Sequence, residues 1–117
     1  MAFEVVRSRA SDRDLERIFD HLVESHQALG DVVGDALERA AARVRAIEDD
    51  MEGLGAAPFQ GTLREDLLPG LRQVTKNRAV FYFLIDADAG QVRILAIFFG
   101  GQDHRAQMLR RLGPGGG

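Results

Sequence analysis

Two long amphipathic stripes in the first half of the chain constrain its fold more than any other feature. Between residues 15 and 29, apolar side chains recur every three or four positions, which places them on one face of a helix. A second stripe runs from Val33 to Leu54 at alternating steps of three and four, a spacing that favours helix packed on helix. The sequence therefore predicts an antiparallel helical hairpin.

Local signals predict where the first elements begin and end. Residues 3–9 alternate between apolar and polar side chains in their first half and form a short expected strand. Ser11, with Asp14 three residues later, is the expected N-cap of the first helix. Gly30 is expected to end that helix, and Asp31 to cap the second one.

Three apolar strands are predicted in the second half, at residues 71–75, 79–86 and 91–99. Their short connections make them antiparallel neighbours. The last strand stops at two glycines, and polar groups follow in a segment, 102–112, that has helical spacing. The predicted class is α+β, in the order β-α-α-β-β-β(-α), with the helical hairpin on one face of a small, mainly antiparallel sheet.

The other face of the sheet is less fully accounted for by the sequence. Phe81, Phe83 and either Phe98 or Phe99 could leave an apolar groove there, although more of these side chains are expected in the core than in a groove. His104 follows the last strand, where its side chain could bind or react at the rim of the sheet or form a surface pair with Asp103. His26 on the first stripe is expected to be a packing residue.

Length and composition favour one small globular domain, expected at residues 1–112, with a flexible glycine-rich tail at 113–117. The chain has no cysteine, so disulfides and thiol chemistry are excluded. Its three histidines are scattered, and the acidic run 48–50 is expected to be solvated, so neither a metal nor another cofactor is predicted. No apolar run reaches the roughly 20 residues that span a membrane, and a cytoplasmic location is expected.

Charge is distributed unevenly along the chain. Residues 1–70 carry 8 Lys/Arg and 15 Asp/Glu, a net charge of −7, whereas residues 71–117 carry 7 and 3, a net charge of +4. This asymmetry favours a basic face for an anionic partner, with chance placement of solvated charges as the alternative. The candidate partner-binding residues are the basic side chains of the second half: Arg72, Lys76, Arg78, Arg93, Arg105, Arg110 and Arg111.

Two of these cations, Arg72 and Arg78, flank a predicted turn that also contains Lys76. They could bind phosphate or an acidic partner, because the guanidinium fork holds two oxygens at once. They could instead pair with Glu65 or Asp66 just upstream. The sequence leaves both interpretations open.

Three segments carry a resemblance to a known family: 61–72 (GTLREDLLPGLR), 77–83 (NRAVFYF) and 92–103 (VRILAIFFGGQD). In this order and at these separations, the chain from Phe3 to about Leu112 resembles the RelE/ParE superfamily of toxins from bacterial type II toxin–antitoxin systems. The resemblance implies a small toxin that a cognate antitoxin binds and silences in a hetero-oligomer.

The superfamily includes two activities: RelE-like members cut messenger RNA on the ribosome, and ParE-like members block DNA gyrase. By resemblance, Arg72 and Arg78 match the basic cluster of the ribonucleases. Gly100, Gly101 and Gln102 stand where those enzymes tend to carry a basic residue, and Met108 lies about where a tyrosine is often found.

These departures favour a ParE-like gyrase inhibitor, which has no chemistry of its own. A RelE-like endoribonuclease, with Arg72, Arg78 and His104 as its catalytic candidates, is the first alternative. A non-toxic, partner-binding remnant of the fold is the second.

Overall fold

The structure is a computed structural model that describes residues 2–100 and 104–113. The elements follow the predicted α+β order, with one additional short strand, β2. Part of the predicted tail, 114–117, and residues 101–103, which include Gln102 and Asp103, lie outside the described residues. The elements are β1 (Glu4–Arg7), α1 (Arg9–Ala28), α2 (Val33–Gly53), β2 (Thr62–Leu63), β3 (Arg72–Lys76), β4 (Ala79–Asp86), β5 (Gln91–Phe99) and α3 (His104–Leu112).

The strands form one sheet in the order β1-β5-β4-β3-β2. The predicted meander is present, because β3 pairs antiparallel with β4, and β4 with β5. β1 is the exception: it lies parallel to β5, with Val5 opposite Val92. The sheet is therefore mainly antiparallel, as predicted.

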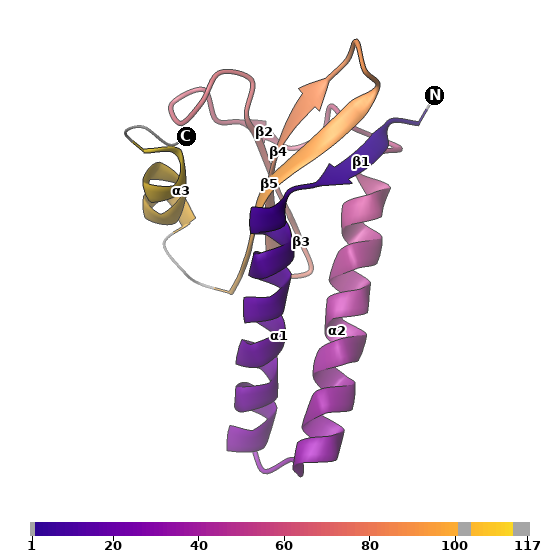
Figure 1. Ribbon diagram of the computed structural model, residues 1–117, viewed down its shortest axis with the longest axis vertical. Helices are drawn as coiled ribbons and strands as arrows, with labels where there is room; N and C mark the ends of the chain where they lie inside the picture. The colour runs from indigo at the N-terminus through magenta and orange to yellow at the C-terminus, as the bar shows by residue number, and fades with distance from the viewer. Residues whose placement is uncertain (1, 101–103, 114–117) are drawn as a thin grey trace.

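The helical hairpin packs on one face of the sheet, and its two helices lie antiparallel and extend beyond the strands (Figure 1). Apolar side chains from both helices meet alternate residues of β4 and β5 in one continuous core. Its largest fully buried members include Ile47, Met51, Phe81, Phe83 and Ile97. The predicted seam is thus confirmed near the sheet, whereas Val33 and Leu37 at the far end of α2 are exposed.

The second face of the sheet is covered by α3, which Figure 1 shows on the side of β5 away from α2. Val80, Tyr82 and Phe98 pack there against Met108 of α3. The expected apolar groove from Phe81, Phe83 and Phe98 or Phe99 is not formed by the described residues, because each of these rings is buried in one of the two cores. Alternation along the strands sends Phe81 and Phe83 to the hairpin face.

Two predicted helix caps are wrong. α1 begins at Arg9, and its N-cap is Ser8, whose hydroxyl accepts a hydrogen bond from the Ser11 backbone N–H at 3.0 Å. Ser11 lies inside the helix, and the supposed capping partner Asp14 is buried in the core. The N-cap of α2 is Val32 and makes no side-chain cap bond, while Asp31 instead faces Arg39 at 3.3 Å.

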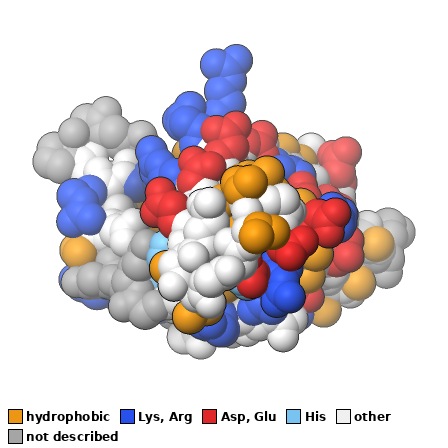
Figure 2. Space-filling view, turned by 90° about the horizontal axis from the view of Figure 1, so that it is seen from below, with side chains coloured by type: hydrophobic (Ala, Val, Ile, Leu, Met, Phe, Trp, Pro, Cys, Tyr) orange, Lys and Arg blue, Asp and Glu red, His pale blue; other side chains and the backbone are white. Residues whose placement is uncertain are grey.

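The free end of the hairpin exposes several apolar side chains. Leu29 is 84% exposed and Val32 66%, and Gly30 between them has a φ of 105°, which glycine adopts readily. Figure 2 looks onto this end of the molecule, where apolar, acidic and basic side chains are mixed. Neither these helices nor α3 combines the length and apolarity that crossing a bilayer requires, in the part of the chain described here.

Candidate functional site

The turn between β3 and β4 has an unusual backbone. Asn77 and Arg78 both have positive φ angles, 50° and 71°. Two-residue hairpin turns require this conformation, which Asn tolerates but which strains an arginine. The strain marks Arg78 as a functional candidate, because such residues persist only where their surroundings fix them.

Neighbouring residues hold this turn in place. Arg43 of α2 donates a hydrogen bond to the Asn77 carbonyl oxygen at 2.7 Å, and the Asn77 side chain donates to Asp50 at 2.9 Å. The Gly100 N–H donates to the Arg78 carbonyl oxygen at 3.2 Å. The turn is therefore fixed against both α2 and the end of β5.

The Arg78 guanidinium lies over the Phe99 ring, 5.2 Å from its centroid, and Arg43 lies over the same ring at 5.5 Å. Both belong to a hollow of about 570 Å³ between the two helices and the end of β5, which we call the basic groove. Its lining includes three arginines around apolar residues, a surface suited to an anionic partner. The lining residues are Leu22, His26, Arg39, Ala42, Arg43, Ala46, Arg78 and Phe99.

Arg78 also borders a second hollow, of about 370 Å³, on the α3 face. His104, at the start of α3, lines it together with Gln73 and Thr75 of β3. The imidazole stacks on the Phe98 ring with centroids 5.4 Å apart and planes at 12°. The structure therefore brings together two of the predicted ribonuclease residues, Arg78 and His104.

Arg72, the third of those residues, lies at the other end of β3. It is opposite Phe83, whereas Lys76 at the turn is opposite Ala79. At about 3.3 Å per residue, the length of the strand separates Arg72 from the turn by roughly 13 Å. Its guanidinium lies over the Phe59 ring at 5.6 Å and donates to the Phe59 carbonyl oxygen at 3.2 Å.

Within the described residues, the predicted alternative partners of Arg72 have other contacts. Glu65 accepts a hydrogen bond from the Gly70 N–H at 3.0 Å. Asp66 contacts Arg64 at 3.2 Å and Arg105 at 3.4 Å. The Arg64 hydrogen bond holds the pKa of the Asp66 carboxyl below its usual value. Pairing of Arg72 with Glu65 or Asp66 is therefore not formed among the described residues, and a role of Arg72 in partner binding stays a prediction.

The remaining predicted cations have different local surroundings. Arg93 is exposed near the β4–β5 connection, where it faces Asp86 at 3.6 Å. Arg110 is exposed on α3. Arg111 turns inward: it donates to both carboxylate oxygens of Asp14, at 2.7 and 2.8 Å, and to the Leu95 carbonyl oxygen at 3.1 Å.

Asp14 is the polar residue whose role sequence reasoning missed. It is 3% exposed, and it also accepts a hydrogen bond from the Ile97 backbone N–H at 2.9 Å. The hydrogen bond to Asp14 raises the pKa of Arg111. A signal was present in the sequence, because Asp14 lies one turn before Ile18 and therefore on the apolar face of α1.

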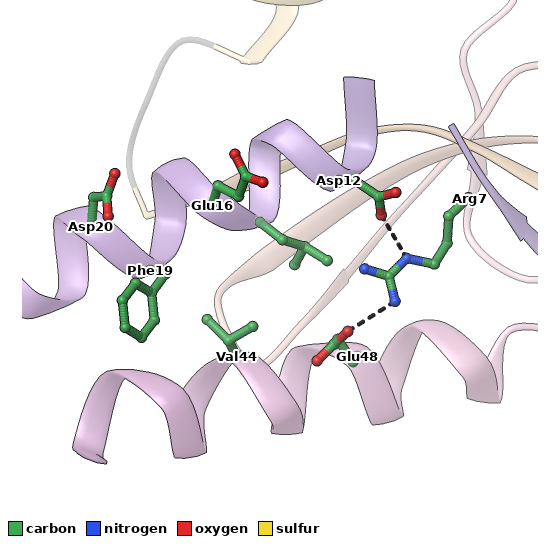
Figure 3. Close-up of a pocket in the computed structure, with 8 residues that line it drawn as sticks. Arg7, Asp12, Glu16, Phe19, Asp20, Val44 and Glu48 are labelled. Carbon is green, nitrogen blue, oxygen red and sulfur yellow. Dashed lines mark hydrogen bonds and ion pairs between the residues drawn. The ribbon is translucent and has the colours of Figure 1, made fainter. Parts of the chain in front are cut away.

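A third hollow, of about 620 Å³, lies between α1 and α2 next to β1 (Figure 3). Leu15 and Phe19 of α1 and Val44 of α2 form its apolar part. We call it the acidic groove, because four carboxylates surround these residues. The lining residues are Arg7, Asp12, Leu15, Glu16, Phe19, Asp20, Val44 and Glu48.

One end of the acidic groove is closed by an ion-pair bridge. Arg7, just before α1, reaches Asp12 and Glu48 at 2.8 Å each, so that it joins the two helices (Figure 3). Burial lowers the pKa of Arg7, but the hydrogen bonds to these two carboxylates more than offset that effect and raise it. Among the described residues, no group of three or more His, Asp or Glu side chains is arranged to hold a metal ion.

Comparison with known proteins finds similarity in three-dimensional structure. No protein-family model and no curated protein matches the sequence. A chain of the chromosomal ParDE TA system from P. aeruginosa superposes with a TM-score of 0.65; it is 24% identical, and the alignment covers 86% of this chain and 98% of that one. The chain has the RelE/ParE-like fold.

A second solved structure with this fold is the RelBE2 toxin–antitoxin complex from Mycobacterium tuberculosis. It superposes with a TM-score of 0.60 at 16% identity, and the alignment covers 87% of this chain and 95% of that one. The RelE/ParE-like fold thus extends over most of the chain, in agreement with the predicted class.

Proposed function

We propose that residues 1–112 form a toxin of a type II toxin–antitoxin system that acts in the cytoplasm on DNA gyrase and is neutralised by a cognate antitoxin. The observation that carries the toxin proposal is the likeness in fold, over nearly all of the chain, to structures from two toxin–antitoxin systems. The fold alone does not choose a target. The choice of gyrase rests on the arrangement of the basic residues.

The proposed ParE-like action on gyrase is supported by the separation of Arg72 from Arg78 and His104. A ribonuclease site needs its cations and its proton-transfer group around one phosphate, within hydrogen-bond reach of the reacting atoms. Arg72 lies at the opposite end of β3 from the turn and is held against Phe59. An inhibitor that acts by binding does not need its cations around one phosphate. Separate cations such as Arg93, Arg105 and Arg110 can each contact a different part of a large partner.

The proposed antitoxin contact is the basic groove. An apolar segment that carries acidic residues fits there, because Phe99 and Leu22 lie beside the guanidinium groups of Arg78 and Arg43. Such charge-assisted bonds contribute about 1.5–3 kcal/mol each. An extended segment that continued along the sheet could also reach Arg72 or Arg93.

Arg78→Gly tests this contact without loss of the fold. Glycine adopts a φ of 71° without strain, so we expect unfolding stability to stay equal or to rise by about 1 kcal/mol. Antitoxin affinity, measured by calorimetry with the product of the neighbouring antitoxin gene, should fall by about 1.5–3 kcal/mol. Arg45→Ala, an exposed arginine on α2 outside the groove, is the matched control, and equal affinities in both variants would reject the location.

The target is tested by expressing the chain without an antitoxin. We expect growth inhibition, loss of gyrase supercoiling in a purified assay and intact messenger RNA on translating ribosomes. Codon-positioned cuts in messenger RNA, with supercoiling unchanged, would overturn the gyrase proposal. Normal growth at verified expression would favour the non-toxic remnant.

The RelE-like ribonuclease is the second candidate, and the hollow shared by Arg78 and His104 favours it. There the guanidinium could hold a phosphate oxygen while the imidazole moves a proton. Under this alternative, His104→Ala abolishes toxicity but leaves antitoxin binding intact. Under the gyrase proposal, the same substitution has a modest effect on toxicity, and changes at Arg105 and Arg110 matter more.

A further inference from the structure

The acidic groove has no role in the function proposed above. It lies next to β1, whereas the basic groove lies at the end of β5 and includes Arg78. We propose that the acidic groove is a second docking surface, which binds a basic amphipathic helix of a partner protein. This inference does not depend on which molecule the toxin acts on.

The shape of the groove fits a helix. α1 and α2 lie antiparallel beside it, and Phe19 and Val44 extend toward one another from the two helices (Figure 3). Both side chains are only half-buried, so they still expose apolar surface to a partner. A third helix packs into such a groove by placing its own apolar side chains between those of the pair.

Charge determines the kind of helix. Asp12, Glu16 and Asp20 follow one another along α1 at four-residue spacing, one turn apart (Figure 3). Like charges at this spacing destabilise a helix by a few tenths of a kcal/mol per pair, so Glu16 and Asp20, unlike the bridged Asp12, do not stabilise the hairpin. Glu16 and Asp20 form no ion pair within the described residues.

Glu48 on α2 adds a fourth carboxylate, and Arg7 is the only cation that lines the groove in the part of the chain described. Because Arg7 already bridges Asp12 and Glu48, the free negative charge is concentrated toward Glu16 and Asp20. Lysines or arginines at three- or four-residue spacing on the incoming helix would lie beside them. An acidic helix would be repelled from the same place.

A designed peptide provides the test. The probe is a fluorescently labelled helical peptide with leucines on one face and lysines beside them, titrated with the whole chain in about 0.1 M salt and followed by anisotropy. We expect saturable binding that weakens as salt rises, because rim charges are screened. A peptide with glutamates in place of the lysines should not bind. Equal binding of both peptides would overturn the proposal.

A matched pair of double variants locates the site. Glu16→Gln with Asp20→Asn removes two charges from the groove, and Glu38→Gln with Asp49→Asn removes two exposed charges from α2 outside the lining. Both change the net charge equally, and all four side chains are exposed, so both variants should fold. The first should bind the lysine peptide about three- to tenfold more weakly and the second as the wild type does.

Equal losses of peptide affinity in the two double variants would mean that only the net charge of the protein attracts the peptide. That result would overturn the acidic groove as the binding site. The basic helix α3 of a second copy is an alternative occupant, since Leu109 and Arg110 are exposed on it. Sedimentation would reveal this as self-association that Leu109→Glu abolishes and that the peptide competes for. That result would overturn the proposal of a partner protein and identify a second copy of this chain as the occupant of the groove.

Discussion

The two faces of the sheet are covered by helices in different ways. On one face, helices of 20 and 21 residues bury a broad apolar core against Phe81, Phe83 and Ile97. On the other, a helix of 9 residues buries one side chain fully, Met108, and is joined to the rest of the protein by the Arg111–Asp14 ion pair.

The difference follows from helix length. Isolated helices shorter than about 12–15 residues are marginal in water, and burial of one methionine contributes only about 1.5–3 kcal/mol. α3 therefore depends on a specific polar contact to fix its position, whereas the hairpin depends on total apolar area. Because His104 begins α3, the hollow that it shares with Arg78 depends on the same ion pair.

The largest expected effect is on the hairpin face. Phe81→Ala removes a fully buried ring from this core and should lower the free energy of unfolding by about 3–5 kcal/mol, as measured by denaturant titration. Val33→Ala at the exposed end of the hairpin should change it by less than about 0.5 kcal/mol. A loss of stability in Phe81→Ala no larger than that in Val33→Ala would contradict the view that the hairpin face depends on buried apolar area.

The next largest effect is on α3. Arg111→Ala leaves the buried Asp14 carboxylate, among the described residues, with the Ile97 N–H and the more distant Arg17, at 3.8 Å, as partners. The substitution should cost about 2–3 kcal/mol, because water can replace in part a side chain that is 25% exposed. Hydrogen exchange should accelerate in α3 before it does in α1. Arg110→Ala is the control, and the same exchange pattern in both variants would argue against the ion pair as the anchor.

A smaller effect tests how far the hairpin face depends on local signals. Ser8→Ala removes the cap of α1 and should cost about 1 kcal/mol in a thermal or denaturant melt. Asp31→Ala should cost less than about 0.5 kcal/mol, because Asp31 makes no cap bond to α2 and its contacts, with Arg39 at 3.3 Å and His26 at 3.6 Å, are long for ion pairs. A larger loss of stability in Asp31→Ala than in Ser8→Ala would favour the helix caps that the sequence predicted.

The smallest effect concerns Asp66, which Arg64 and Arg105 contact near the start of α3. Its pKa in the folded protein is lowered from 3.8, so its contribution to stability is present above that value and is lost as the pH falls through the folded pKa. Wild type should therefore exceed Asp66→Asn in stability at about pH 6, and the difference should shrink as the pH falls below 3.8. A stability difference between wild type and Asp66→Asn that is independent of pH would contradict the lowered pKa of Asp66.

The sequence determined the elements of this protein because their signals are local. The strands at 79–86 and 91–99 and the helical hairpin have the predicted positions, since side-chain periodicity depends only on near neighbours. The sequence also singled out Arg78 and His104, which the structure places at one hollow. It missed β2, whose two residues are too few to show a period.

Only the tertiary structure decided how the charged residues are used. Arg72 and Arg78 are six positions apart, yet Arg72 begins β3 and Arg78 lies in the turn beyond the other end of that strand. Asp14 and Arg111 are 97 residues apart and join α1 to α3 through an ion pair at 2.7 Å. The spacing of polar residues in a sequence indicates which side chains lie on the surface. The partner of each charged side chain is fixed by long-range packing, which brings distant segments together. In the protein interior a buried charge must be paired.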